Sequence, residues 1–257
     1  KNAINEGKEE DILVIDNKIH KIDSDIIYQA DKTIDGKGKW IIPGFINMHT
    51  HAAMTLMRGI GEDMYLKEWL EDKIWPVEQK LDDELVYWGT KLACLEMVKT
   101  GTTTFNDQYW RVPAAIKAVE EAGLRSVQPF VILDLLDLSK SSKIKEDCEA
   151  LFQESKTWSD LHKFAIGIHS PYSVSEEMIV WGSEYARSRG LLLHIHLSET
   201  EWENSESIKK HGVSPTAYLD KLGVLGPEVI AAHSLWLSDS DIEILANKGV
   251  TVVHNIN

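Results

Sequence analysis

Histidine residues follow several apolar segments of the sequence, at positions where a hydrophobic core would not place them. They are His49, His51, His169, His196, His233 and His254, and Asp107 takes the same position after another segment. Imidazole nitrogen suits zinc, iron, nickel or copper, whereas magnesium and calcium prefer oxygen ligands. No cysteine belongs to this set, so the pattern predicts a catalytic metal site and not a structural zinc site.

The pair His49 and His51 is the first predicted part of that site. In extended backbone, residues two positions apart point to the same side, so both imidazoles can bind one cation. His196 is the third predicted ligand; spacing alone would also allow His194, but His196 lies nearer the following loop and Glu199. Three histidines and a carboxylate leave room for a water molecule, whose pKa the metal lowers to about 7. Zinc is the expected metal, with iron as the alternative.

Glu199 comes three residues after His196. A carboxylate just beyond a strand end could carry a proton between the metal-bound water and a leaving group. Glu201 and Glu203 belong to the same acidic cluster, so the alternative is an acidic helix N-terminus. We predict that Glu199 is the general acid and base of the site.

Seven apolar segments must position these residues. They span residues 40–46, 102–105, 126–133, 164–168, 191–195, 229–232 and 250–253. Between them lie helical patterns with start or stop signals at residues 82–100 and 175–190, from Pro215 onward, and from Ser238 to before Gly249. Strands and helices that alternate in this way imply parallel strands covered by helices.

The predicted fold is an α/β, TIM-type (β/α)8 barrel that lacks its last βα unit. Barrel enzymes build their sites at the C-terminal ends of the strands, which is where the histidines stand. A doubly wound open sheet is the alternative, but it would favour a glycine-rich phosphate turn, and the sequence contains neither a GxGxxG nor a Walker motif.

Two further expectations concern burial. In the helix at residues 82–100, the predicted inward face consists of Leu85, Trp88, Leu92, Leu95 and Val98. Three histidines stand among polar residues and are expected at the surface, namely His20, His162 and His211.

Residues 1–40 are predicted to form a small partial β-sandwich module. Strand patterns at residues 12–15 and 19–22 flank the turn Asp16-Asn17-Lys18. So few strands cannot bury a core of their own. Residues 41–257 then form the metal-dependent hydrolase barrel. We expect this barrel to be truncated at its C-terminus, because the sequence ends where a strand runs into a loop.

The charge balance excludes several classes of partner. Lys and Arg number 27 and Asp and Glu 41, which gives a net charge of −14. Nucleic acid polymers and anionic membranes are bound through basic residues, so neither is expected. No apolar run approaches the roughly 20 residues of a membrane helix. The two unpaired cysteines indicate the cytoplasm, a small molecule is the expected partner, and homo-oligomerisation stays open.

Several motifs together resemble the amidohydrolase superfamily. The first is the segment from Ile42 to Gly59, which contains Pro43-Gly44 and His49-Thr50-His51. The likeness continues in order through His169-Ser170-Pro171-Tyr172, His196-Leu197-Ser198-Glu199-Thr200, Ala232-His233-Ser234 and His254-Asn255, and so covers nearly the whole chain. Within the superfamily, the chain is most similar to the S-adenosylhomocysteine/methylthioadenosine deaminases of the chlorohydrolase and deaminase branch.

The resemblance implies a mononuclear site with His49, His51 and His196 as metal ligands. An aspartate after an eighth strand, which this sequence does not contain, would be the fourth ligand. Glu199 would protonate the purine ring nitrogen while metal-bound hydroxide attacks the carbon that bears the amine. His233 would orient the hydroxide or the tetrahedral intermediate.

The resemblance also implies that Glu78 and His169 contact the substrate, through ribose hydroxyls and the ring. Some members hold the carboxylate of adenosylhomocysteine with arginines after strand three. The corresponding residues 126–134 contain no arginine, which favours a neutral nucleoside or heterocycle.

The predicted function is therefore hydrolytic deamination of an aminated purine nucleoside or a related heterocycle. A triazine-type chlorohydrolase and a guanine or cytosine deaminase are alternatives, because the same site chemistry serves them. A non-catalytic scaffold is the alternative from another class. The presence of His49, His51, His196 and Glu199 together argues against it.

Overall fold

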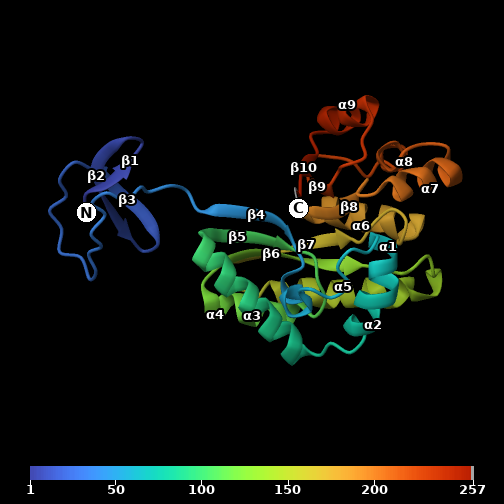
Figure 1. The fold of residues 1–257 in the computed structure, drawn as a ribbon, viewed down its shortest axis with the longest axis horizontal. Coiled ribbons are helices and arrows are strands. Elements are labelled where there is room, and N and C mark those ends of the chain that lie inside the picture. Colours follow the sequence, from blue (N-terminus) through green and yellow to red (C-terminus); the bar gives the residue numbers. More distant parts are fainter. Residues whose placement is uncertain (256–257) are drawn as a thin grey trace. The chain divides into compact units, whose positions relative to one another are not determined.

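The computed structural model describes residues 1–255 and divides the chain into two compact units, Lys1–Gly44 and Phe45–Asn257. The first unit contains an antiparallel sheet in the order β1-β2-β3 (Figure 1). Its strands are β1 (Ala3–Asn5), β2 (Lys8–Ile15) and β3 (Lys18–Asp23). Asp16 and Asn17 turn the chain between β2 and β3 with φ of 48° and 60°, the left-handed conformation that a two-residue hairpin turn requires.

Up to residue 255, the second unit contains seven parallel strands that curve into a nearly closed barrel. Each strand pairs with the next in chain order. They are β4 (Phe45–Thr50), β5 (Thr102–Asp107), β6 (Arg125–Ile132), β7 (His162–Ile168), β8 (Leu193–Leu197), β9 (Val229–His233) and β10 (Thr251–Val253). Residues 45–48 of β4 and residues 252–255 line one shared cavity, so the two edge strands face each other. The predicted barrel of parallel strands is confirmed.

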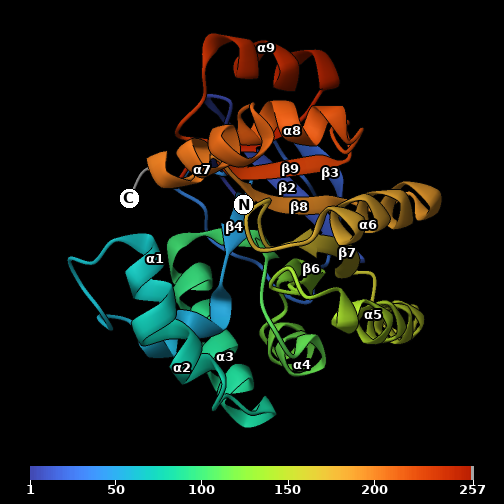
Figure 2. The same ribbon diagram turned by 90° about the vertical axis from the view of Figure 1, so that its right-hand side faces the viewer.

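The helices that follow the strands lie around the outside of the barrel (Figure 2). They are α3 (Asp83–Thr100), α4 (Val112–Ala122), α5 (Ser141–Ser155), α6 (Glu176–Arg189), α7 (Glu201–His211), α8 (Pro215–Lys221) and α9 (Asp239–Lys248). The four predicted helices correspond to α3, α6, α8 and α9, whereas α4, α5 and α7 were not predicted. Capping explains the predictable ends: Ser238 and Asp241 form a capping box at α9.

Four short helices connect β4 to α3, and each contributes to the lining of a cavity at the C-terminal ends of the strands. They are the 3-10 helix η1 (Ala52–Met57), α1 (Leu66–Trp69), the π-helix η2 (Leu70–Ile74) and α2 (Trp75–Glu78). None of the helices between residues 1 and 255 combines the length and apolar character that a membrane span requires.

The predicted inward face of α3 is wrong. The residues expected there, Leu85, Trp88, Leu92, Leu95 and Val98, are between 37% and 57% exposed. The buried face consists instead of Val86, Gly89, Thr90, Ala93, Cys94 and Met97. A Cβ at Gly89 would lie 2.3 Å from the carbonyl oxygen of Ala53, so α3 approaches η1 too closely for large side chains. Small residues, and not the large apolar ones, therefore mark the packed face.

The strands β6 to β9 are anchored by a core of fully buried aliphatic residues. Ile166, Ile168 and Ile195 pack with Met178 and Ile179 of α6 in one cluster. Such a core is close-packed and resists deformation, so the strand ends that follow it have fixed positions.

His162 corrects another expectation, because it is buried and not at the surface. It begins β7, where its Nδ1 lies 2.9 Å from the hydroxyl of Ser126 on β6. The polar sequence around it reflects a strand start, and pairing with the neighbouring strand covers the ring.

Candidate metal and catalytic site

One cavity of about 310 Å³ is lined by all seven residues predicted as metal ligands, catalytic residues or substrate contacts. It lies at the C-terminal ends of the parallel strands, the usual place for a barrel site. The predicted residues that line it are His49, His51, Glu78, His169, His196, Glu199 and His233. His254 is exposed and does not line it, whereas the next residue, Asn255, does.

The rings of His51 and His196 face each other with both Nε2 atoms unprotonated. Nδ1 of His51 lies 2.7 Å from the carbonyl oxygen of Gln108, and Nδ1 of His196 lies 2.6 Å from that of His169. A carbonyl can only accept, so each Nδ1 carries the proton and donates it. The two Nε2 atoms are then 3.2 Å apart with no hydrogen between them. Two lone pairs repel at this distance unless a cation lies between them.

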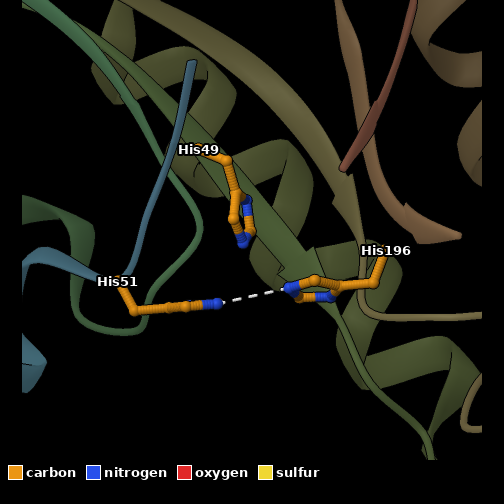
Figure 3. Close-up of side chains that lie close together, drawn as sticks. All are labelled: His49, His51 and His196. Carbon is orange, nitrogen blue, oxygen red and sulfur yellow. Dashed lines mark hydrogen bonds between the residues drawn. The ribbon is translucent and has the colours of Figure 1, made fainter. Parts of the chain in front are cut away.

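The third ring, His49, completes a group that fits a metal ion. Its ligand nitrogen and those of His51 and His196 all lie within 4.8 Å of one another, and Figure 3 shows the three rings converging from β4 and β8. Zinc–nitrogen bonds of about 2.0–2.1 Å in a tetrahedral site place two ligand atoms about 3.3 Å apart, close to the separation of the His51 and His196 nitrogens. The donor set therefore suits a divalent transition metal.

His194 lies behind His49. Its Nε2 is 2.9 Å from Nδ1 of His49, and its side chain is buried. The Nδ1 of His49 is thus engaged by a neighbouring group, as is the Nδ1 of each of the other two rings. Outer partners of this kind fix the orientation of a metal-binding imidazole. The structure separates the two histidines of β8 by position: His196 joins the three-ring group and His194 supports it.

Burial keeps the three imidazoles neutral. It lowers the pKa of His49 and His51, and it lowers that of His196 well below the usual value. Neighbouring imidazoles add to the effect on His49 and His196. Neutral imidazole is the form that binds a metal.

Asp107 supports the turn that carries His51. Its Oδ1 accepts hydrogen bonds from the Thr50 hydroxyl at 2.9 Å and from the Ala52 N–H at 2.8 Å, the residues on either side of His51. Burial raises the pKa of Asp107 to about 6. The sequence placed Asp107 among the strand-end residues, and the structure puts it behind the metal group, outside the cavity lining.

Glu199 and His233 face each other across the cavity. Oε1 of Glu199 lies 3.6 Å from Nε2 of His233. The side-chain amide of Asn255 donates to Nδ1 of His233 at 3.0 Å, which leaves the ring proton on Nε2, toward Glu199. Burial, with a contribution from Glu203, raises the pKa of Glu199 to about 7, and burial lowers that of His233 to about 4.

Three residues at or beside Glu199 and His233 have a strained backbone. Ser198, His233 and Ser234 have φ of 48°, 70° and 51°, a region that residues other than glycine rarely adopt. The carbonyl oxygen of Ser198 accepts from the N–H groups of Leu235 and Trp236, so the turns after β8 and β9 hold each other. Strained residues of this kind cluster at functional sites.

Glu78 and His169 line the same cavity from different elements of the fold. Glu78 ends α2, and burial raises its pKa. His169 follows β7, where its Nδ1 lies 2.7 Å from the Ser173 hydroxyl, and burial lowers its pKa to about 4. One carboxyl group and one neutral imidazole are thus available to a molecule bound next to the metal group.

The profile of the amidohydrolase family matches residues 40–257. The chain belongs to this family. The amidohydrolase is 47% identical over 247 residues to the 5-methylthioadenosine/S-adenosylhomocysteine deaminase of Thermococcus sibiricus, and 44% identical over 246 residues to the 5'-deoxyadenosine deaminase of Methanothermobacter thermautotrophicus. Each match covers 95% of this chain and 58% of the relative. The chain therefore spans less than two thirds of the length of these curated relatives.

Two solved structures superpose on this chain. A zinc-bound adenosine deaminase from Xanthomonas campestris superposes with a TM-score of 0.77 at 33% identity, over 82% of this amidohydrolase and 49% of that chain. The zinc complex of the atrazine chlorohydrolase from Arthrobacter aurescens superposes with a TM-score of 0.86 at 23% identity, over 97% of this chain and 61% of that chain. The second likeness concerns the fold alone.

Proposed function

We propose that this amidohydrolase is a metal-dependent hydrolytic deaminase of an aminated purine nucleoside. The observation that carries the proposal is the convergence of three neutral imidazoles, whose ligand nitrogens lie within 4.8 Å of one another, on a cavity that also contains a carboxyl group with its pKa raised to about 7. The relatives that are named as deaminases of methylthioadenosine, adenosylhomocysteine and 5'-deoxyadenosine support the choice of substrate class.

His49, His51 and His196 would hold the metal, and we propose zinc, with iron as the alternative. A nitrogen-only set at these distances suits tetrahedral zinc, and two of the similar structures contain zinc. When bound, the ion would lower the pKa of a coordinated water to about 7 and supply hydroxide at neutral pH. Metal analysis of the purified protein distinguishes the two metals.

Glu199 would move the protons. With a pKa of about 7, its carboxyl group is partly protonated at neutral pH, the condition under which a group can both give and take a proton. It would protonate the ring nitrogen as the oxygen of water bonds to the carbon that bears the amine. Glu199 would next take the remaining proton from that oxygen and pass it to the amine. The carbon–nitrogen bond would then break, and ammonia would leave.

His233 would orient the reacting oxygen. Its Nε2 proton points toward Glu199, and its lowered pKa keeps the ring neutral at pH 7. A neutral donor at this place can hydrogen-bond the oxygen that develops charge. Glu78 would accept hydrogen bonds from ribose hydroxyls, and His169 would contact the ring.

A second, outer cavity supports a nucleoside whose 5' substituent carries no negative charge. Tyr172 and Glu199 line both cavities, so the outer one continues from the inner one. Much of its lining is apolar or aromatic: Tyr65, Leu66, Leu70, Trp75, Leu135, Leu136, Trp202 and Trp236. Its lining also contains one lysine, Lys67, and the acidic residues Glu68, Glu71 and Glu201. An anionic substituent would therefore meet net repulsion, so we propose 5'-deoxy or methylthio nucleosides as substrates.

We also propose that the protein works in the cytoplasm. Cys94 and Cys148 are both free and buried, and unpaired thiols are typical of a reducing compartment.

Ammonia release from a panel of compounds tests the function. We expect release from 5'-deoxyadenosine and methylthioadenosine, slower release from adenosylhomocysteine, and none from adenosine monophosphate. Deamination of guanine or cytosine alone, or chloride release from a chlorotriazine, would replace the proposal by one of those activities. Purified protein with far less than one equivalent of transition metal and no turnover would indicate a non-catalytic scaffold.

A further inference from the structure

We propose that Glu203 is the positioning residue for Glu199: its carboxylate fixes the turn that carries Glu199, and its charge sets when Glu199 holds a proton. This inference rests on the proposed role of Glu199 in the deaminase. Glu203 is the third residue of α7 and is only 2% exposed. A carboxyl group is almost never buried to this extent unless it is paired.

The hydrogen bonds of Glu203 differ from those of an ordinary helix cap. Thr200 and Glu203 have the spacing of a capping box, in which the glutamate would bond the N–H of the threonine. Thr200 does accept from the Glu203 N–H. The carboxylate instead reaches further back, where Oε1 accepts from the Ser198 N–H and Oε2 from the Glu199 N–H, each at 2.9 Å.

These two bonds hold a turn that is strained. Ser198 is in the left-handed region with φ of 48°, a conformation that is unfavourable for residues other than glycine. Its N–H is bound by Glu203, and its carbonyl oxygen by the N–H groups of Leu235 and Trp236. Glu203 therefore provides one of the two sets of contacts that keep Glu199 pointing into the cavity.

The two carboxyl groups also compete for protons. Burial raises the pKa of both to about 7, and the charge of Glu203 contributes to the raised pKa of Glu199. Each oxygen of Glu203 accepts a backbone N–H, and protonation would sacrifice such a bond. Glu203 thus favours the ionised form, and a proton shared by the pair resides on Glu199.

Other charged groups near the pair leave this conclusion unchanged. They are Tyr172 from the loop after β7, His233 from β9, Lys67, Glu68 and Glu71 from α1 and η2, and Glu201, Glu206 and Lys210 from α7. Tyr172 and His233 are neutral at pH 7, because burial raises the pKa of the first and lowers that of the second. Lys67 lies 5.2 Å above the ring of Trp202, whereas Glu203 is bound to the backbone of Glu199 itself.

Glu203→Gln tests the inference. The substitution keeps the size of the side chain, removes its charge, and turns one accepting oxygen into a donor. We expect the limb of the kcat/KM profile that belongs to Glu199 to move about one pH unit lower, with full metal content. Glu206→Gln, which removes a charge from the same helix, is the matched control and should leave the profile unchanged. If Glu203→Gln lowers the melting temperature but leaves the kcat/KM profile unshifted, Glu203 acts only as a structural cap.

An infrared measurement keeps the inference testable without turnover. The C=O band of protonated Glu199 can be identified because Glu199→Gln removes it. As the pH rises, this band should disappear near pH 7 in the parent protein and at a lower pH in Glu203→Gln. Equal titration of this band in both proteins would overturn the inference. If Glu203→Gln does not fold, Glu203→Asp should fold, keep the charge and weaken the two backbone bonds, lowering kcat with little shift of the band. Absence of ammonia release from every nucleoside would refute the proposed function, and the band would still report on the pair.

Discussion

A buried carboxylate supports each of the two turns that carry the chemistry of the site, one after β4 and one after β8. Asp107 accepts two hydrogen bonds from the residues that flank His51, and Glu203 accepts two from Ser198 and Glu199. Burial raises the pKa of both acids. The two turns therefore use the same means of support.

The two turns differ in what the carboxylate faces. Asp107 lies behind neutral imidazoles, where a negative charge would favour a cation bound between His49, His51 and His196. Glu203 lies behind another carboxyl group, where a negative charge favours a proton on Glu199. A buried carboxylate would thus support the proposed metal binding at one turn and the proposed proton transfer at the other, and the identity of its neighbour decides which. Substitutions at the two turns should separate these effects.

The largest expected effect is that of His196→Ala. The substitution removes one of the three convergent nitrogens and leaves the turn after β8 otherwise intact. We expect loss of bound metal and of measurable turnover, because a site with two imidazoles no longer holds the ion. Metal analysis and ammonia release measure both. Retention of a full equivalent of metal would remove His196 from the ligand set.

Glu199→Gln should separate metal binding from turnover. The amide cannot carry the proton, so we expect kcat to fall by about 10²–10⁴-fold, while the metal content stays that of the parent protein. His196→Ala serves as the comparison, since it loses both. A normal rate in Glu199→Gln would refute its assigned role.

Asp107→Ala should weaken the β4 turn alone. It leaves the Thr50 hydroxyl and the Ala52 N–H without their acceptor, which costs about 1–3 kcal/mol in the free energy of unfolding. We expect metal affinity to fall by about 10–100-fold, measured by competition with a chelator. Asp107→Asn keeps an accepting oxygen, so its metal affinity should lie between that of the parent protein and that of Asp107→Ala. A shifted Glu199 limb in Asp107→Ala would contradict the separation of the two turns.

The pH profile of the parent protein gives the smallest of these effects. The pKa of Glu199 is raised to about 7, so the protonated form that serves as donor is lost as the pH rises through that value. We expect kcat/KM to fall about tenfold from pH 6 to pH 8 on this limb alone. An activity independent of pH across this range would exclude Glu199 as the donor.

Much of the barrel could be predicted, because its signals are local. Apolar segments, caps and stop residues identified all seven strands of the second unit and four of its helices. The first strand begins at Phe45, later than the predicted residue 40, since Pro43 lacks the N–H that a strand ladder needs. The inward face of α3 could not be predicted, because close approach to η1 at Gly89 selects small residues where periodicity suggested large ones.

The support of the site was also beyond prediction. Glu203 and Glu201 look alike in the sequence, yet one carboxylate is buried against the Ser198 turn and the other faces the outer cavity. Asn255 adjoins a histidine of the predicted set, but it is the asparagine, and not His254, that reaches His233.

The sequence by itself determined which residue types stand at the strand ends and how far apart they are along the chain. That was enough for the barrel and the candidate ligands, because parallel strands bring their C-terminal ends to one edge. Only the tertiary structure decided the rest: which imidazoles converge, which buried carboxylate supports which turn, and which carboxyl groups have a raised pKa. These properties depend on burial and on hydrogen-bond partners from distant segments, which no local pattern records.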